Sequence, residues 1–159
     1  MSSTESAANP LFAVGTPPRF EEITPNHVHE AMPVLLEQTQ RELSTFESSV
    51  EPTWEGIFER LRLITDPVQY AWKITSHLMG VRNSDALREA HETFQPAMVE
   101  LYNTMRQSQP IYDALEALEA GPQWSTLGGV RQRLVEKELT SMRLAGLALE
   151  GDERARFNV

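Results

Sequence analysis

The sequence predicts an all-α fold. Apolar residues recur at the three- and four-residue spacing of an α-helix through most of the chain, and no stretch shows the alternation of a half-buried strand. Threonine, serine or proline stands where several of the periodic stretches begin, as helix starts require. With 159 residues, 40% of them hydrophobic, the chain is large and apolar enough to bury a core.

Residues 1–23 are predicted to form an extended N-terminal arm. Pro10, Pro17 and Pro18 fix extended backbone and disfavour a regular helix. Phe12 and Phe20 are the apolar residues expected to anchor this arm on the helical body. Residues 1–8 are expected to fray, as chain ends usually do.

The first helix is predicted at about 25–49. Thr24 can cap it, and Pro25 at its first position needs no amide partner. Apolar residues then follow at helical intervals. Pro33 lies inside this pattern, and because the periodicity resumes in phase, a kink is expected there rather than a break.

Two shorter helices are predicted next, at about 54–65 and 67–81. Thr53 is placed to open the first of them, and Asp66-Pro67 is expected to end it and cap the second. Apolar residues occupy most of the second of these helices, which is therefore expected to be the most buried element.

Three further helices are predicted at about 85–107, 110–120 and 126–148. Ser84 can cap the first of them, and Pro96 predicts a kink within it. Gly121 and Pro122 stop the second. Residues 152–157 resemble the first turns of another helix, and an isolated helix that short would be marginal in water. Residues 24–159 are therefore interpreted as a helical region truncated at the start of a further helix.

Charge and composition exclude several classes of function. The 14 basic and 23 acidic side chains give a net charge of −9, which opposes binding to nucleic acid or to an anionic membrane surface. There is no cysteine, so disulfides, thiolate metal sites and thiol nucleophiles are ruled out. No apolar run is long enough to span a membrane, and the first residues lack the features of a signal or transit peptide. The cytoplasm is the expected location.

The histidines do not form a metal-binding motif. A zinc peptidase helix needs His-Glu-x-x-His, which places two imidazoles on one face beside a glutamate that polarises water. His91-Glu92 begins this pattern, but Gln95 replaces the second histidine; His29-Glu30 fails in the same way at Pro33. No glutamate stands three residues before any histidine, which opposes a carboxylate-bundle metal site.

The remaining chemistry is equally sparse. His77 and His91 are predicted to be buried or half-buried and hydrogen-bonded, and His27 and His29 to be surface residues. There is no Gly-x-Ser-x-Gly turn, and Gly128-Gly129 lacks the lysine of a phosphate-binding loop. No catalytic, cofactor-binding or metal-binding residue is therefore predicted within this chain.

An ordered series of short motifs resembles the start of bacterial oligopeptidase A-like members of the thimet oligopeptidase family. The likeness covers about residues 9–157. In order, the motifs are Asn9-Pro10-Leu11, Pro18-x-Phe20, Ile23-x-Pro25-x-His27-Val28, Trp54, Ser76-His77-Leu78-x-x-Val81-x-Asn83-Ser84, Leu87-Arg88-Glu89-Ala90-x-Glu92, Pro96, Glu100-Leu101-Tyr102, Arg143-Leu144-Ala145-Gly146-Leu147-x-Leu149 and Arg156-Phe157. None of these is a catalytic signature.

The resemblance implies a parent enzyme that is a zinc metalloendopeptidase acting on short peptides. It implies that these N-terminal helices help to wall a channel that limits substrate size, and that they pack against a C-terminal catalytic region absent from this chain. The zinc ligands and catalytic glutamate of the family lie in that later region, so no residue is carried over. Zinc is expected in the parent and not on this chain, which alone is expected to be inactive.

A second hypothesis stays open: a free-standing helical module that binds peptides or proteins without catalysis. The fragment hypothesis predicts exposed apolar surface where later helices would pack, whereas the module hypothesis predicts a cooperatively folded, soluble monomer or dimer. The sequence does not discriminate peptide specificity, the residues that line the channel or the oligomeric state.

Overall fold

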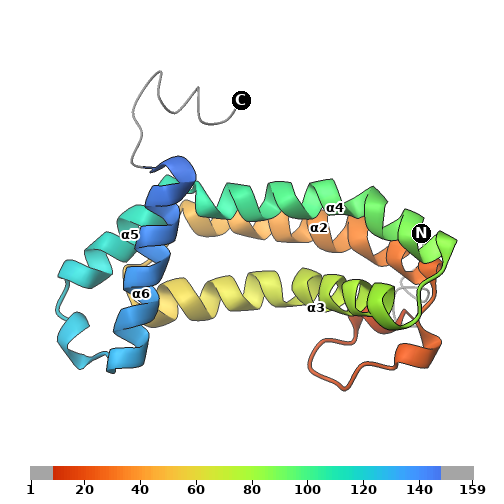
Figure 1. The fold of residues 1–159 in the computed structure, drawn as a ribbon. Helices are drawn as coiled ribbons and strands as arrows, with labels where there is room; N and C mark the ends of the chain where they lie inside the picture. The colour runs from red at the N-terminus through yellow and green to blue at the C-terminus, as the bar shows by residue number, and fades with distance from the viewer. Residues whose placement is uncertain (1–8, 148–159) are drawn as a thin grey trace. The chain divides into compact units, whose positions relative to one another are not determined.

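The computed structural model describes residues 9–147, and these residues are mostly helical and contain no strand. Five α-helices follow one another along the chain (Figure 1). They are α2 (Pro25–Glu47), α3 (Arg60–Val81), α4 (Asp85–Arg106), α5 (Gln109–Ala120) and α6 (Gly129–Met142). The all-α prediction is confirmed. The further helix expected at residues 152–157 lies outside the described residues.

The chain divides into two compact units. Unit 1 contains the described residues up to Leu43 together with Arg62–Glu100, and unit 2 contains Ser44–Leu61 together with the described residues from Leu101 onward. The long helices α2, α3 and α4 therefore each contribute residues to both units.

In unit 1, aromatic contacts join α4 to both neighbouring long helices. The ring of Phe94 lies edge-on to His29 of α2, with centroids 5.7 Å apart. The ring of His91 stacks on Trp72 of α3, with centroids 4.3 Å apart. Behind these contacts is a core of fully or almost fully buried aliphatic side chains from the three helices, among them Val28, Met32, Val68, Ala71, Ala90 and Met98.

In unit 2, α5 packs against α6 (Figure 1) and against the helical segment that leads into α3. The largest side chains buried here include Ile57, Leu101, Leu115, Leu118, Val135 and Leu139. Ser108 caps α5 by accepting a hydrogen bond from Ile111 N, and Pro110 occupies the first turn, where its missing amide costs nothing.

The N-terminal arm is less extended than predicted, because it contains 3-10 turns at Pro10–Phe12 and Phe20–Glu22. The predicted anchors are only partly right, since Phe20 does contact the ring of His77 in α3 but is not the most buried residue of the arm. Leu11 is fully buried, whereas Phe12 is half-buried and Phe20 is exposed. Asn9 fixes the start of the arm, since its Nδ2 donates to the carbonyl of His27 at 2.9 Å while its Oδ1 accepts from Leu11 N.

The predicted break at Asp66-Pro67 is also wrong. A π-type segment at Glu55–Glu59 runs directly into α3, and Pro67 lies inside that helix. The buried residues Ile64, Val68 and Ala71 keep one continuous face across the proline. Their burial offsets the hydrogen bond that the proline removes, so the helix continues.

The other predicted bounds hold to within a few residues. Helices α2 and α4 continue through Pro33 and Pro96, as expected. The last helix begins later than predicted, because Trp124–Thr126 forms a separate 3-10 turn and Gly128 caps α6. It ends in a π-type turn at Arg143–Leu147 in which Gly146 has a φ of 97°, a conformation that favours glycine.

Candidate functional site

His91, the histidine that begins the incomplete zinc motif, is part of the packing between α3 and α4. It is half-buried, its ring stacks on Trp72, and its Nε2 lies 3.3 Å from Ser76 Oγ. This confirms the prediction of a half-buried, hydrogen-bonded side chain. The imidazole is held between the helices by an indole and a hydroxyl, and neither is a zinc ligand.

The other three histidines differ from their predictions. His77 is exposed, not buried, and its ring lies 5.4 Å from that of Phe20 in the arm. His27 and His29 are half-buried, not exposed. His27 Nδ1 accepts a hydrogen bond from the backbone amide of Thr24 at 3.3 Å, so this histidine completes the start of α2.

Within residues 9–147, no three histidine or carboxylate side chains come together in an arrangement that could hold a metal ion. The four histidines are distributed along unit 1, and each is engaged by an aromatic ring or by a neighbouring polar group. The described residues therefore do not assemble a hydrolytic metal centre.

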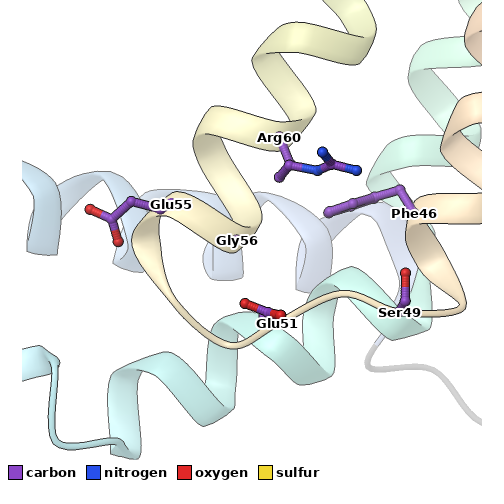
Figure 2. Close-up of a pocket in the computed structure, with 6 residues that line it drawn as sticks. All are labelled: Phe46, Ser49, Glu51, Glu55, Gly56 and Arg60. Atoms are coloured by element: carbon purple, nitrogen blue, oxygen red, sulfur yellow. The ribbon is translucent and has the colours of Figure 1, made fainter.

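A hollow of about 440 Å³ lies in unit 2, where the end of α2 turns toward α3 (Figure 2). It is called the α2–α3 hollow below, and it is lined by Phe46, Ser49, Glu51, Glu55, Gly56 and Arg60. Its volume is in the range typical of small-ligand sites, but charged and polar groups form much of its lining.

The loop beside this hollow is held by short-range hydrogen bonds. Thr53 N donates to the carbonyl of Glu51 at 2.8 Å, and Thr53 Oγ1 accepts from Gly56 N at 2.9 Å, which confirms Thr53 as a cap. A side chain at Gly56 would meet the Glu51 carbonyl at 2.6 Å and Thr53 Oγ1 at 2.7 Å. Glycine is therefore needed at this position so that the loop can approach the helix.

Gln123 ties the same loop to a distant part of unit 2. Its Oε1 accepts from Trp54 N at 2.8 Å, and its Nε2 donates to Glu55 Oε2 at 3.0 Å. The indole of Trp54 stacks on Phe58, with centroids 4.3 Å apart, and Arg131 Cζ lies 4.7 Å from its ring centroid. Gln123, in the loop after α5, and Arg131 of α6 thus fix the beginning of the helical segment that leads into α3.

The first backbone amides of this helix are all engaged. Trp54 N bonds to Gln123, Gly56 N to the Thr53 hydroxyl and Ile57 N to the Thr53 carbonyl. The hydrogen bond from its own backbone amide lowers the pKa of the Glu55 carboxyl group. The hydrogen bond from Gln123 and the charge of Arg131 lower this pKa further. The helix start therefore offers no unoccupied amide to an anion.

Two opposite charges remain in the α2–α3 hollow. Within the described part of the chain, neither the guanidinium of Arg60 nor the carboxylate of Glu51 forms an ion pair or a side-chain hydrogen bond. Figure 2 shows Arg60 on the first turn of α3 above the hollow and Glu51 on the loop below it. The two groups line one cavity without pairing with each other.

A second polar cluster joins α5 to the end of α6. Tyr112 Oη donates to Glu116 Oε1 at 2.6 Å and accepts from Arg143 Nε at 2.8 Å, while Arg143 Nη2 lies 3.2 Å from Glu116. The Tyr112 bond and the Arg143 guanidinium lower the pKa of Glu116, and the same contacts raise the pKa of Arg143. The cluster closes on itself, so it fastens two elements and leaves no group aimed at a ligand.

A hollow of about 370 Å³ in unit 1 lies where α2 and α4 begin. Its polar rim is provided by Thr24, Arg82, Asn83 and Ser84. The hydroxyls of Thr24 and Ser84 accept from His27 N and Leu87 N, which confirms both as helix caps. These hydroxyls are therefore already used by the helices themselves.

Sequence reasoning identified Thr53 as a cap but missed the α2–α3 hollow. The hollow depends on the close approach of the loop to Gly56. It also depends on the hydrogen bond between Trp54 N and the side chain of Gln123, 69 residues away in sequence. The local feature that could have indicated this loop is Pro52-Thr53 with Gly56 three residues later. Gln123 gave no signal, since a glutamine after Gly121-Pro122 reads as an ordinary loop residue.

Comparison with known proteins matches residues 32–154 to the family model for the Neurolysin/Thimet oligopeptidase, N-terminal domain. The chain is 38% identical over 152 residues to the probable cytosolic oligopeptidase A of Arabidopsis thaliana, covering 96% of this chain and 22% of that protein. It is 37% identical over 158 residues to the organellar oligopeptidase A, chloroplastic/mitochondrial, of the same plant, covering 99% of this chain and 20% of that protein.

The similarity extends to bacteria. Oligopeptidase A of Escherichia coli (strain K12) is 29% identical over 150 residues, covering 94% of this chain and 22% of that protein. The chain thus spans about a fifth of the length of these relatives. The matched model covers most of the helical region described above, from within α2 to beyond α6. This chain belongs to the neurolysin/thimet oligopeptidase N-terminal domain family.

Proposed function

We propose that this chain is the N-terminal, substrate-restricting wall of a zinc-dependent oligopeptidase that hydrolyses short peptides. Its helices would help to enclose a channel, and sequence outside this chain would supply the zinc ligands and the catalytic glutamate. The observation that carries the proposal is the family match over residues 32–154, combined with relatives named as oligopeptidases that are about five times longer than the match.

The side chains of residues 9–147 support a role in shape rather than in chemistry. They provide no grouping suited to a metal ion, and the histidines are used in packing or capping. If the parent binds zinc, three protein ligands and a water molecule would be needed at an open site. That requirement is met most simply by a His-Glu-x-x-His helix elsewhere in the polypeptide.

Exposed apolar side chains on α6 and the turn after it support packing against a further region. Val130 and Leu144 are 74% and 75% exposed, and Leu134 is also exposed. Surface aliphatic residues are common singly, but three within 15 residues of α6 and the turn after it suit a partially covered face. We propose that the catalytic region of the parent covers it.

None of the helices described here is long and apolar enough to cross a membrane. We propose a cytoplasmic location, as the name of the cytosolic plant relative suggests. The name of the organellar relative shows which result would contradict this: import of the complete protein into chloroplasts or mitochondria. Fluorescence microscopy of the tagged, complete gene product distinguishes the two.

The primary test is a peptidase assay on the purified 159-residue chain. With added zinc and a fluorogenic short peptide, we expect no hydrolysis above the rate without protein. Chelator-sensitive cleavage by the chain alone would contradict the proposal. In parallel, an open reading frame that encodes His-Glu-x-x-His downstream of this chain would identify the catalytic region directly.

The alternative of a free-standing interaction module makes a different physical prediction. A module should unfold cooperatively as a soluble monomer or dimer. A wall segment with an uncovered apolar face should self-associate or unfold with low cooperativity. Sedimentation velocity and thermal unfolding of the chain separate these outcomes. A sharp transition in a monodisperse sample would favour the module.

A further inference from the structure

We infer that the α2–α3 hollow binds the two charged ends of a short, unblocked peptide. Arg60 would bind the terminal carboxylate, and Glu51 would bind the terminal ammonium group. The choice of a peptide as ligand rests on the function proposed above. The charge complementarity rests only on the residues of the hollow.

The hollow is already formed by contacts within the chain. Thr53 caps Gly56, and the Glu51 carbonyl accepts from Thr53 N, so the loop is closed by its own hydrogen bonds. Trp54 N donates to the side chain of Gln123, which lies 69 residues later in the sequence. A ligand would therefore meet walls whose backbone needs little reordering, which lowers the entropic cost of binding.

Two charged side chains of the hollow are available to a ligand. The carboxylate of Glu55 is occupied by Gln123 Nε2 and by its own amide, and the helix amides are all bonded. Among the residues that line the hollow, Arg60 and Glu51 are the two charged side chains without a partner in the described part of the chain. They carry opposite charges, and no ion pair joins them.

The hollow also has a size that suits a short peptide. Two opposite charges that line one cavity but do not pair leave a gap that a zwitterion can bridge. An extended peptide advances about 3.3–3.6 Å per residue, so two or three residues separate its termini by roughly 7–11 Å. The volume of about 440 Å³ accommodates a ligand of that length. Guanidinium is also the side chain best suited to bind a carboxylate through two parallel bonds.

Titration of the complete 159-residue chain with the tripeptide Gly-Phe-Gly tests the inference, with binding followed by two-dimensional NMR of backbone amides. We expect shifts centred on residues 46–60 and a dissociation constant on the order of 1 mM, since exposed charge pairs contribute little each. Amidating the C-terminus or acetylating the N-terminus should each weaken binding about three- to fivefold. Raising the salt concentration to 1 M should weaken it further.

Two variants assign the termini. In Arg60→Gln, amidation of the peptide should have no further effect; in Glu51→Gln, acetylation should have none. Arg133→Gln and Glu136→Gln on α6 make the same changes of charge at exposed positions away from the hollow, and they should bind the free peptide as the wild type does. Folding of each variant is verified by its unchanged amide spectrum outside the loop.

Several results would overturn the inference. They are an absence of shifts at the solubility limit of the peptide, shifts that map outside the hollow, equal binding of the doubly blocked peptide, or equal weakening by the two α6 variants. The titration needs no metal and no hydrolysis. A parent without peptidase activity would therefore contradict the proposed function and leave the binding result standing, and the reverse also holds.

Discussion

The backbone amide of Trp54 donates to the side-chain oxygen of Gln123 at 2.8 Å, across 69 residues of sequence. The Nε2 of the same side chain donates to the Glu55 carboxylate, so one glutamine makes two hydrogen bonds at the start of the helix. Because this amide lies before the first intrahelical bond, no backbone carbonyl of the helix can replace Gln123.

Replacing Gln123 by alanine should lower the free energy of unfolding by about 1–2 kcal/mol, since it leaves a part-buried amide without an acceptor. Urea denaturation followed by circular dichroism measures the loss. Gln109→Ala is the matched control, because Gln109 bonds only to Asp113 one turn away on an exposed face. Its effect should stay within about 0.5 kcal/mol, and equal losses in the two variants would contradict the role given to Gln123.

Gly56→Ala should destabilise the chain, whereas Gly80→Ala should stabilise it. An added Cβ at Gly56 would lie 2.6 Å from the Glu51 carbonyl, and relieving such a clash costs about 1–3 kcal/mol. At Gly80, in the last turn of α3, the added Cβ meets nothing within 4 Å. The gain there is the helix propensity of alanine over glycine, about 0.5–1 kcal/mol.

The opposite signs make this pair informative, and thermal unfolding of the two variants measures both. Helix propensity acts in the same direction at both glycines. A stabilising effect of Gly56→Ala would therefore show that the loop moves away from the helix without cost. It would also remove the argument that the hollow is rigid.

Pro67→Ala should stabilise the chain by about 1–3 kcal/mol, because it returns an amide to the interior of α3 and lets the Leu63 carbonyl accept its helical bond. Pro110→Ala is the control, since Pro110 lies in the first turn of α5 and removes no helical bond there. That variant should be neutral or slightly destabilised, because proline also restricts the unfolded chain. Chemical denaturation of both variants provides the comparison.

The Tyr112–Glu116–Arg143 cluster should make stability depend on pH on the acidic side. The hydrogen bond from Tyr112 and the Arg143 guanidinium hold the pKa of Glu116 below its ordinary value in the folded chain. The unfolded chain therefore binds the proton more readily. The contribution of Glu116 is fully present above the ordinary glutamate pKa of about 4.3 and is lost as the pH falls through the lower folded-state value.

Glu116→Gln should accordingly flatten the decline in unfolding free energy below about pH 4.5 without changing the slope near pH 7. Tyr112→Phe, which removes only the donor hydroxyl, should flatten the decline partly. Denaturant unfolding at a series of pH values measures these slopes. Identical slopes in the wild type and in Glu116→Gln would exclude a contribution from the cluster.

Most of the fold could be predicted from local patterns. The hydroxyls of Thr24, Thr53 and Ser84 cap the helices where the sequence places them, because a cap acts on amides two or three residues away. Pro33 and Pro96 were correctly read as lying within helices, since the apolar periodicity continues past each of them.

The predictions fail where contacts between residues distant in sequence determine the structure. The sequence predicts a helix boundary at Pro67, but continuous burial of Ile64, Val68 and Ala71 outweighs the lost hydrogen bond. His77 was read as buried from its place in an apolar helix, yet it faces the arm near Phe20 and remains exposed. Periodicity indicates that a helix has an apolar face, but it does not indicate how completely a short arm covers it.

The α2–α3 hollow could not be predicted from local sequence patterns either, because it also depends on contacts between distant residues. Its charges, Arg60 and Glu51, are ordinary surface residues by sequence. They become neighbours only because Gly56 permits close approach and Gln123 fixes the loop from afar. The membership of the family, by contrast, could be read from the order and spacing of short motifs, and the match over residues 32–154 confirms it.

Each of the three long helices contains one interior proline, at Pro33, Pro67 and Pro96. A proline offers no amide to the carbonyl four residues before it, so each of these helices lacks one hydrogen bond in its interior. In deuterium exchange, the amides next to each proline of α2, α3 and α4 should therefore be less protected than the amides one turn farther away. Helices α5 and α6, whose interiors are free of proline, should each exchange as one block.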